Sequence, residues 1–187
     1  MTALLGNPLW FTTRATGTIA LILLTVTVVI GVAGAGRYAP SAVGRFEINA
    51  LHRNLSLLCL ALLAVHLGTT LADSYVPIGL VSALVPFVSP YRTLWVAFGT
   101  VAFDLLLAVA LTSAVRLRMG LRRWKAVHYL AYAAWPAAVL HGFNTGTDSK
   151  LGAQQLLYVL CVVCFVVAGS WRLYRRAAAG RFAGGDA

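Results

Sequence analysis

Five long apolar blocks constrain the fold of this chain more than any other feature. They lie at about 17–35, 48–71, 94–115, 126–143 and 151–171, and short polar or basic gaps separate them. A helix needs about 20 mostly apolar residues to cross the hydrocarbon core of a bilayer. We therefore predict an all-α membrane protein with a bundle of five transmembrane helices. Residues 1–16 would form an extracytoplasmic N-terminal segment, and 172–187 a basic cytoplasmic tail.

The distribution of charge predicts the orientation of the bundle. Only 11% of the residues are charged, yet the formal net charge is +10. Twelve of the 15 basic residues would share one side of the membrane, in the gaps after the first and third spans and in the tail. By the positive-inside rule that side is cytoplasmic, so the N-terminus lies outside and the C-terminus in the cytoplasm. Because the charges follow this topology pattern, we expect no nucleic-acid partner.

All four histidines of the chain lie in the second and fourth predicted spans. His52 and His66 are 14 residues apart, and His128 and His141 are 13 apart. Both spans are predicted to run outward, which puts His52 with His128 near the cytoplasmic face and His66 with His141 near the outer face. Ionisable side chains inside a membrane are expensive and mark function by default. We therefore interpret the histidines as two pairs of ligands rather than as ordinary core residues.

Zinc, copper and heme iron are the species that such pairs can bind. A metal-ion site draws three or four ligands together from His, Cys or carboxylate side chains. Each depth here offers two histidines, which suits a heme iron with an imidazole on either side. The alternatives that remain are a membrane metal-binding or transport protein, and a one-heme protein in which one pair is unused.

Pro136 and Asp104 are unusual within their predicted spans. At about 100° per residue, 13 steps leave His141 about 140° away from the face of His128. Pro136 lies between them and removes a helical hydrogen bond, so we expect a kink there that helps to aim His141. Asp104 lies near the middle of the third span. We interpret it either as a proton site or as a structural hydrogen-bonding group.

The spacing His-x13-His followed by His-x12-His resembles the heme-binding helices of the ferric reductase and NADPH-oxidase transmembrane family. "TSAVRLRMGLRRWKAVHYLAY" (112–132) resembles the basic loop before the family's second histidine helix. "LWFTTRATG" (9–17) and "HGFNTGTDS" (141–149) are similar to its compact, single-domain bacterial members of the actinobacterial type. The resemblance implies two b-type hemes, the inner one held by His52 and His128 and the outer one by His66 and His141.

The resemblance also implies that basic side chains bind the heme propionates. Arginine binds carboxylates well. Arg53 and Arg123, with neighbouring Arg122 and Lys125, are candidates for the inner propionates, although the positive-inside rule also explains them. Arg14 and Arg92, on the side with few charges, are candidates for the outer ones. No glycine-rich dinucleotide loop follows a strand, so we expect no FAD or NADPH site in this chain.

We therefore predict a ferric reductase-like, di-heme b-type cytochrome of the inner or plasma membrane, an oxidoreductase-type component that carries electrons to an extracytoplasmic acceptor. A separate flavoprotein or membrane quinol would donate the electrons. The resemblance implies two candidate partners on the outer side, an FMN-bearing protein or a periplasmic methionine-sulfoxide reductase. We expect the proline-punctuated segment 73–92 to cap the outer heme or to dock such a partner.

Overall fold

The computed structural model describes residues 8–35, 44–74, 78–146 and 152–183, and all regular structure within them is α-helical. The helices are α1 (Pro8–Ala35), α2 (Arg45–Ala72), α3 (Leu80–Leu84), α4 (Thr93–Ala114), α5 (Arg116–Met119), α6 (Leu121–His128), α7 (Ala131–Thr145) and α8 (Gly152–Ala183). Within the described residues, α1, α2, α4 and α8 are long and apolar enough to cross a membrane. Arg37, Lys150 and residues 1–7 of the predicted N-terminal segment lie outside the described residues.

α1 and α8 extend by nine or more residues beyond their predicted bounds. α1 begins at Pro8, nine residues before the predicted start of the first span. Proline suits the first helical position because its missing N–H needs no partner there. Arg14, within the predicted N-terminal segment 1–16, therefore lies on this helix. α8 continues to Ala183 through most of the predicted tail, where the alanines of 177–179 favour the helix.

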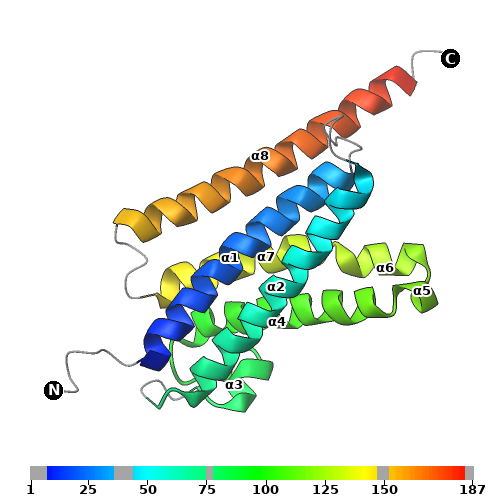
Figure 1. Ribbon diagram of the computed structural model, residues 1–187. Coiled ribbons are helices and arrows are strands. Elements are labelled where there is room, and N and C mark those ends of the chain that lie inside the picture. The colour runs from blue at the N-terminus through cyan, green and yellow to red at the C-terminus, as the bar shows by residue number, and fades with distance from the viewer. Residues whose placement is uncertain (1–7, 36–43, 75–77, 147–151, 184–187) are drawn as a thin grey trace.

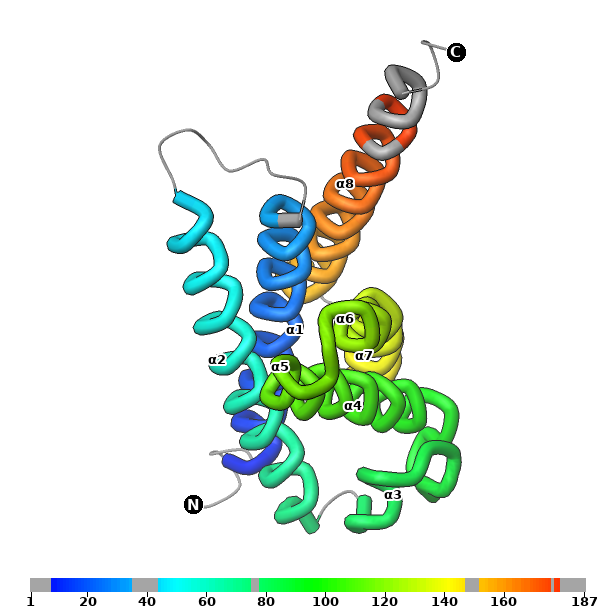
Figure 2. Tube along the Cα trace, turned by 90° about the vertical axis from the view of Figure 1, so that its right-hand side faces the viewer, coloured from blue at the N-terminus to red at the C-terminus, as the bar shows by residue number. Residues whose placement is uncertain are grey.

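The helices form two crossing pairs, with α8 added on one side (Figures 1 and 2). α1 packs along α2, α4 packs along α7, and α1 also contacts α7 and α8. Within the described residues no extensive contact joins α2 to α4, α6 or α7. The core lies where α1 meets the other helices, and it contains Ala20, Leu24 and Val28 of α1 with Cys59, Trp135 and Cys161. Most of the surface of α2 is therefore left to face lipid or the space between the two pairs.

The fourth predicted span is divided into two helices, so the continuous helix expected over 126–143 is not formed. α6 ends at His128 and α7 begins at Ala131. Between them Leu130 donates its N–H to the carbonyl of Val127, and Tyr132 to that of Tyr129, at 2.9 and 3.0 Å. These three-residue bonds are those of a tight 3₁₀ turn. α7 alone has 15 residues and spans about 22 Å, less than a hydrocarbon core of about 30 Å.

The helical path changes at this turn, seven residues before Pro136. α7 is helical on both sides of Pro136, although the proline has no N–H for the carbonyl of Tyr132. A 3₁₀ residue advances by about 120°, about 20° more than an α-helical residue. The turn at Tyr129–Leu130 therefore supplies part of the rotation between His128 and His141 that the sequence assigned to the proline.

Candidate functional site

The structure brings the four histidines together in the two predicted pairs. The ring centroids of His52 and His128 lie 6.1 Å apart, and the ring planes make an angle of 59°. The ring centroids of His66 and His141 lie 6.3 Å apart, with the planes at 84°. Each pair joins α2 to the helices of the fourth predicted span. The two pairs lie at opposite ends of that stretch of α2, about 21 Å apart at 1.5 Å per residue.

Three of the four imidazoles form a hydrogen bond from Nδ1 to a backbone carbonyl. His66 bonds to Thr13 at 2.8 Å, His52 to Thr27 at 3.1 Å, and His141 to Trp95 at 2.9 Å. A carbonyl only accepts, so Nδ1 carries the proton in each ring. Nε2 is then the unprotonated nitrogen, which is the form that binds a metal.

A glycine makes room for each of these three rings. It lies four residues after the carbonyl that accepts the hydrogen bond, one helical turn along. A Cβ at Gly17 would meet the His66 ring at 2.8 Å, one at Gly31 the His52 ring at 3.1 Å, and one at Gly99 the His141 ring at 2.5 Å. Carbon atoms in van der Waals contact lie about 3.5–4.0 Å apart. We call the carbonyl bond and the glycine together the glycine brace.

His128 lacks this brace. Its Nδ1 is buried and has no hydrogen-bond partner among the described residues. Its ring instead lies 4.9 Å from the indole of Trp124, at an angle of 30°. Trp124 donates from Nε1 to the hydroxyl of Ser113 at 3.2 Å. Side chains from α4 and α6 therefore hold the fourth histidine.

A cavity surrounds the outer pair. Its lining comes from α1, α2, α3, α4, α7 and α8 and includes His66 and His141 with their glycines Gly17 and Gly99. The segment predicted to cap this site contributes Ile78, Ser82, Ala83 and Tyr91. Thr100 of α4 donates to the carbonyl of Ser82 at 2.9 Å, which fastens α3 over the cavity.

The two arginines predicted near the outer site lie in different surroundings. Arg14 lines the cavity, and its guanidinium lies 5.8 Å from the centroid of the Trp10 ring. Arg92 is exposed and donates to the carbonyl of Asn144, so it joins the start of α4 to the end of α7. It does not line the cavity. Arg14 is therefore the better placed of the two to meet an anionic group in the cavity.

The remaining predicted residues lie away from the cavity. Arg53 and Arg123 are exposed, on α2 and α6, each within five residues of a histidine of the inner pair. Asp104 is half-buried on α4 and is not part of the cavity lining.

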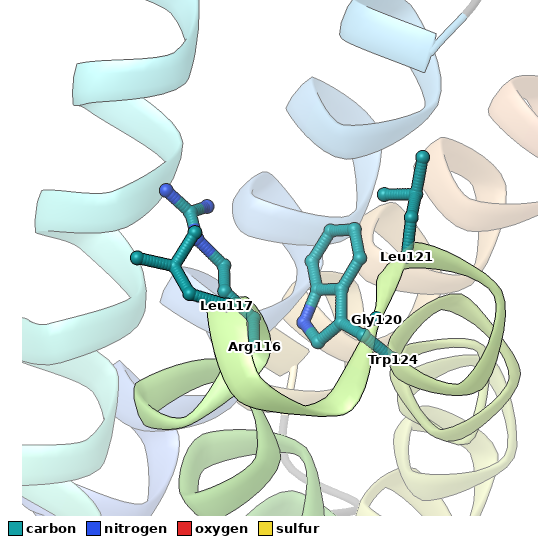
Figure 3. A pocket seen from close by; sticks show the side chains of 5 residues that line it. All are labelled: Arg116, Leu117, Gly120, Leu121 and Trp124. Atoms are coloured by element: carbon teal, nitrogen blue, oxygen red, sulfur yellow. The ribbon is translucent and has the colours of Figure 1, made fainter.

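A shallow second pocket forms at the corner of α4, α5 and α6. It is lined by Arg116, Leu117, Gly120, Leu121 and Trp124. Figure 3 shows the indole of Trp124 between Leu117 on one side and Leu121 on the other. The tryptophan that stacks on His128 is thus reachable from this end of the bundle.

Several residues near the histidines were not predicted as site residues. Besides the three glycines, they include Tyr158 of α8, which lines the cavity. Arg172 donates to the hydroxyls of Tyr132 and Tyr129, at 3.1 and 3.5 Å, and so fastens α8 to the turn before α7. The sequence contains one sign of the glycine braces, since Gly17 and Gly31 have the same 14-residue spacing as His52 and His66.

The fold and the histidines together define a multi-span helical membrane protein with two internal histidine pairs. The chain belongs to the family of ferric reductase-like transmembrane components, whose model matches residues 16–139. It is also 27% identical over 184 residues to the protein-methionine-sulfoxide reductase heme-binding subunit MsrQ of Ralstonia nicotianae. That similarity covers 96% of this chain and 79% of the relative. No solved structure matches significantly.

Proposed function

We propose that this protein is a di-heme b-type cytochrome that carries electrons across the membrane, with His52 and His128 as ligands of an inner heme and His66 and His141 of an outer one. The observation that carries the proposal is the two facing imidazole pairs, with centroid separations of 6.1 and 6.3 Å. Membership of the ferric reductase-like family and the heme-binding name of the Ralstonia relative support it.

The separations fit a metal between two imidazoles. A metal–nitrogen bond of about 2 Å on each side, added to the radii of the two rings, gives a centroid separation of roughly 6 Å. Among the described residues, no three His, Cys, Asp or Glu side chains gather as a metal-ion site would require. A donor set of two imidazoles is therefore better suited to a heme, which brings its own four nitrogen ligands. This favours the cytochrome over the metal-transport alternative.

The residues of the chain prepare the sites for electron transfer. When bound, a heme supplies a one-electron couple at each site. The three glycine braces fix the tautomer and orientation of their histidines, and apolar helices keep water from the bundle. Two histidines per site leave no open position on the metal, which favours electron transfer over chemistry at the metal itself. Arg14 offers a charged donor to a propionate in the outer cavity.

Positive-inside topology makes the His52–His128 end cytoplasmic. Electrons would then pass outward, from a flavoprotein or membrane quinol to an extracytoplasmic acceptor. The similarity to the Ralstonia subunit extends over nearly the whole chain. It favours one particular role, that of heme-binding membrane subunit for a periplasmic methionine-sulfoxide reductase. Ferric iron or an FMN-bearing protein are the other acceptors.

Two histidine variants test the assignment of the ligands. We expect His52→Ala and His66→Ala each to remove one heme, and each to remove a different one. Reduced-minus-oxidised spectra combined with a potentiometric titration of each purified variant identify the heme that remains. If both variants lose the same component, or if neither loses any, the ligand assignment is wrong.

A further inference from the structure

Three of the four histidines are held by a glycine brace, and the fourth, His128 of the inner pair, is not. His52, His66 and His141 each have a glycine brace. His128 has a buried Nδ1 without a hydrogen-bond partner among the described residues. A buried polar atom without a partner is uncommon in a native structure and calls for a specific cause.

The chain differs from the other three sites on α4, at the position where their pattern has a glycine. On α1 the two brace glycines, Gly17 and Gly31, are 14 residues apart. On α4 the brace glycine of the outer site is Gly99, and 14 residues later the chain has Ser113. The carbonyl four residues before it, that of Val109, is the counterpart of the acceptors in the other three braces. That carbonyl accepts a hydrogen bond from the Thr112 hydroxyl at 3.2 Å, and Ser113 has a side chain where the other three braces have none.

Ser113 also has a role that glycine lacks. Its hydroxyl accepts the hydrogen bond from Trp124, at 3.2 Å. Trp124 in turn lies against the His128 ring, with 4.9 Å between centroids. Serine at this position therefore removes the backbone brace and fixes the indole that holds His128 in its place.

We propose that Ser113 and Trp124 are positioning residues for His128, and that replacing the glycine brace makes His128 the weakest electron donor of the four ligands. The inference rests on the proposed function, since it concerns a heme bound between His52 and His128. A hydrogen bond from the second ring nitrogen raises the basicity of a metal-bound imidazole. Without it, His128 stabilises ferric iron less, and the inner heme has a higher midpoint potential than a fully braced site.

Ser113→Gly is the decisive variant, because it recreates the missing brace. We expect the His128 ring to reach the Val109 carbonyl and the ferric form of the inner heme to be favoured on the order of tenfold. That change lowers the one-electron midpoint potential by about 59 mV. The outer heme keeps its potential. The readout is a potentiometric titration of the purified two-heme protein, with the inner heme identified by its loss in His52→Ala.

Two matched variants separate this effect from a general disturbance of α4. Ser113→Ala keeps a Cβ and removes only the hydroxyl, so it loosens Trp124 without restoring the brace, and the inner potential should not fall. Ala114→Gly introduces the same helix-destabilising residue at the next, exposed position. It should leave both potentials unchanged.

The inference is overturned if Ser113→Gly leaves the inner potential unchanged, shifts the outer heme, or acts no differently from Ser113→Ala or Ala114→Gly. Its failure is distinct from failure of the proposed function. A wild-type protein without heme refutes the proposed function. A two-heme protein whose midpoint potentials do not change in Ser113→Gly refutes only the role given to Ser113.

Discussion

Adding a methyl group at the brace glycines should weaken heme binding in an order that the structure sets. An ideal Cβ would lie 2.5 Å from Nδ1 of His141 at Gly99, 2.8 Å from the His66 ring at Gly17, and 3.1 Å from the His52 ring at Gly31. With contact distances of about 3.5–4.0 Å, the ring must retreat by about 1 Å at Gly99 and by about half that at Gly31.

Overpacking of this kind costs about 1–3 kcal/mol. At 1.4 kcal/mol per factor of ten, Gly99→Ala should weaken outer heme binding by about 100-fold. Gly17→Ala should follow closely at the same site, and Gly31→Ala should weaken inner heme binding by less than about tenfold. The assay is the heme-to-protein ratio of each purified variant during titration with heme, with reduced-minus-oxidised spectra to identify the heme lost.

The chain provides matched controls in two other helical glycines. A Cβ at Gly68 of α2 or Gly169 of α8 would meet nothing within 4 Å. Gly68 lies only two residues from His66, so it shares the local helix but not the close approach. Alanine there should keep both hemes and stabilise the helix slightly. The reasoning is refuted if Gly99→Ala retains both hemes with unchanged affinity, or if Gly68→Ala loses heme to the same extent.

Three further predictions test the roles of the outer arginines, of Arg172 and of the core. Arg14→Ala should weaken outer heme binding by about tenfold or more through loss of a charge-assisted bond, whereas Arg92→Ala should not, and heme titration compares the two. Arg172→Leu frees the tyrosines of the turn before α7 and should alter the spectrum of the inner heme alone; an altered outer heme would contradict this. Trp135→Ala removes a ring that is 4% exposed and stacked 4.0 Å from Phe165, so the bundle should lose about 3–5 kcal/mol in a denaturant titration. A loss below about 1 kcal/mol would argue against this core.

The histidine pairs could be predicted from the sequence because their positions follow from helical periodicity and membrane depth alone. His52 and His66 recur on nearly one face of a helix, and the structure pairs them as expected with His128 and His141. The glycine braces could not be derived in the same way. Their function depends on which helix lies against which histidine, and that is known only once α1 is seen to pack on α2 and α4 on α7.

The break between α6 and α7 shows a different limit of prediction from the sequence. Proline is the usual sequence signal for an interrupted helix, and Pro136 lies within α7 rather than at the break. The turn at Tyr129–Leu130 contains neither glycine nor proline. Besides its backbone hydrogen bonds, it is linked to α8 by hydrogen bonds from Arg172 to the hydroxyls of Tyr132 and Tyr129. The sequence alone places Arg172 only in the basic tail, because its partners lie 40 and 43 positions away in the chain.

The most direct test of the central claim is the heme content of the purified wild-type protein. The account predicts about two hemes per chain, with the spectral bands of b-type cytochromes in the reduced-minus-oxidised spectrum and both hemes six-coordinate. A single heme per chain would leave one histidine pair unused and contradict the two-site account. A colourless protein that binds zinc would overturn the proposed function altogether.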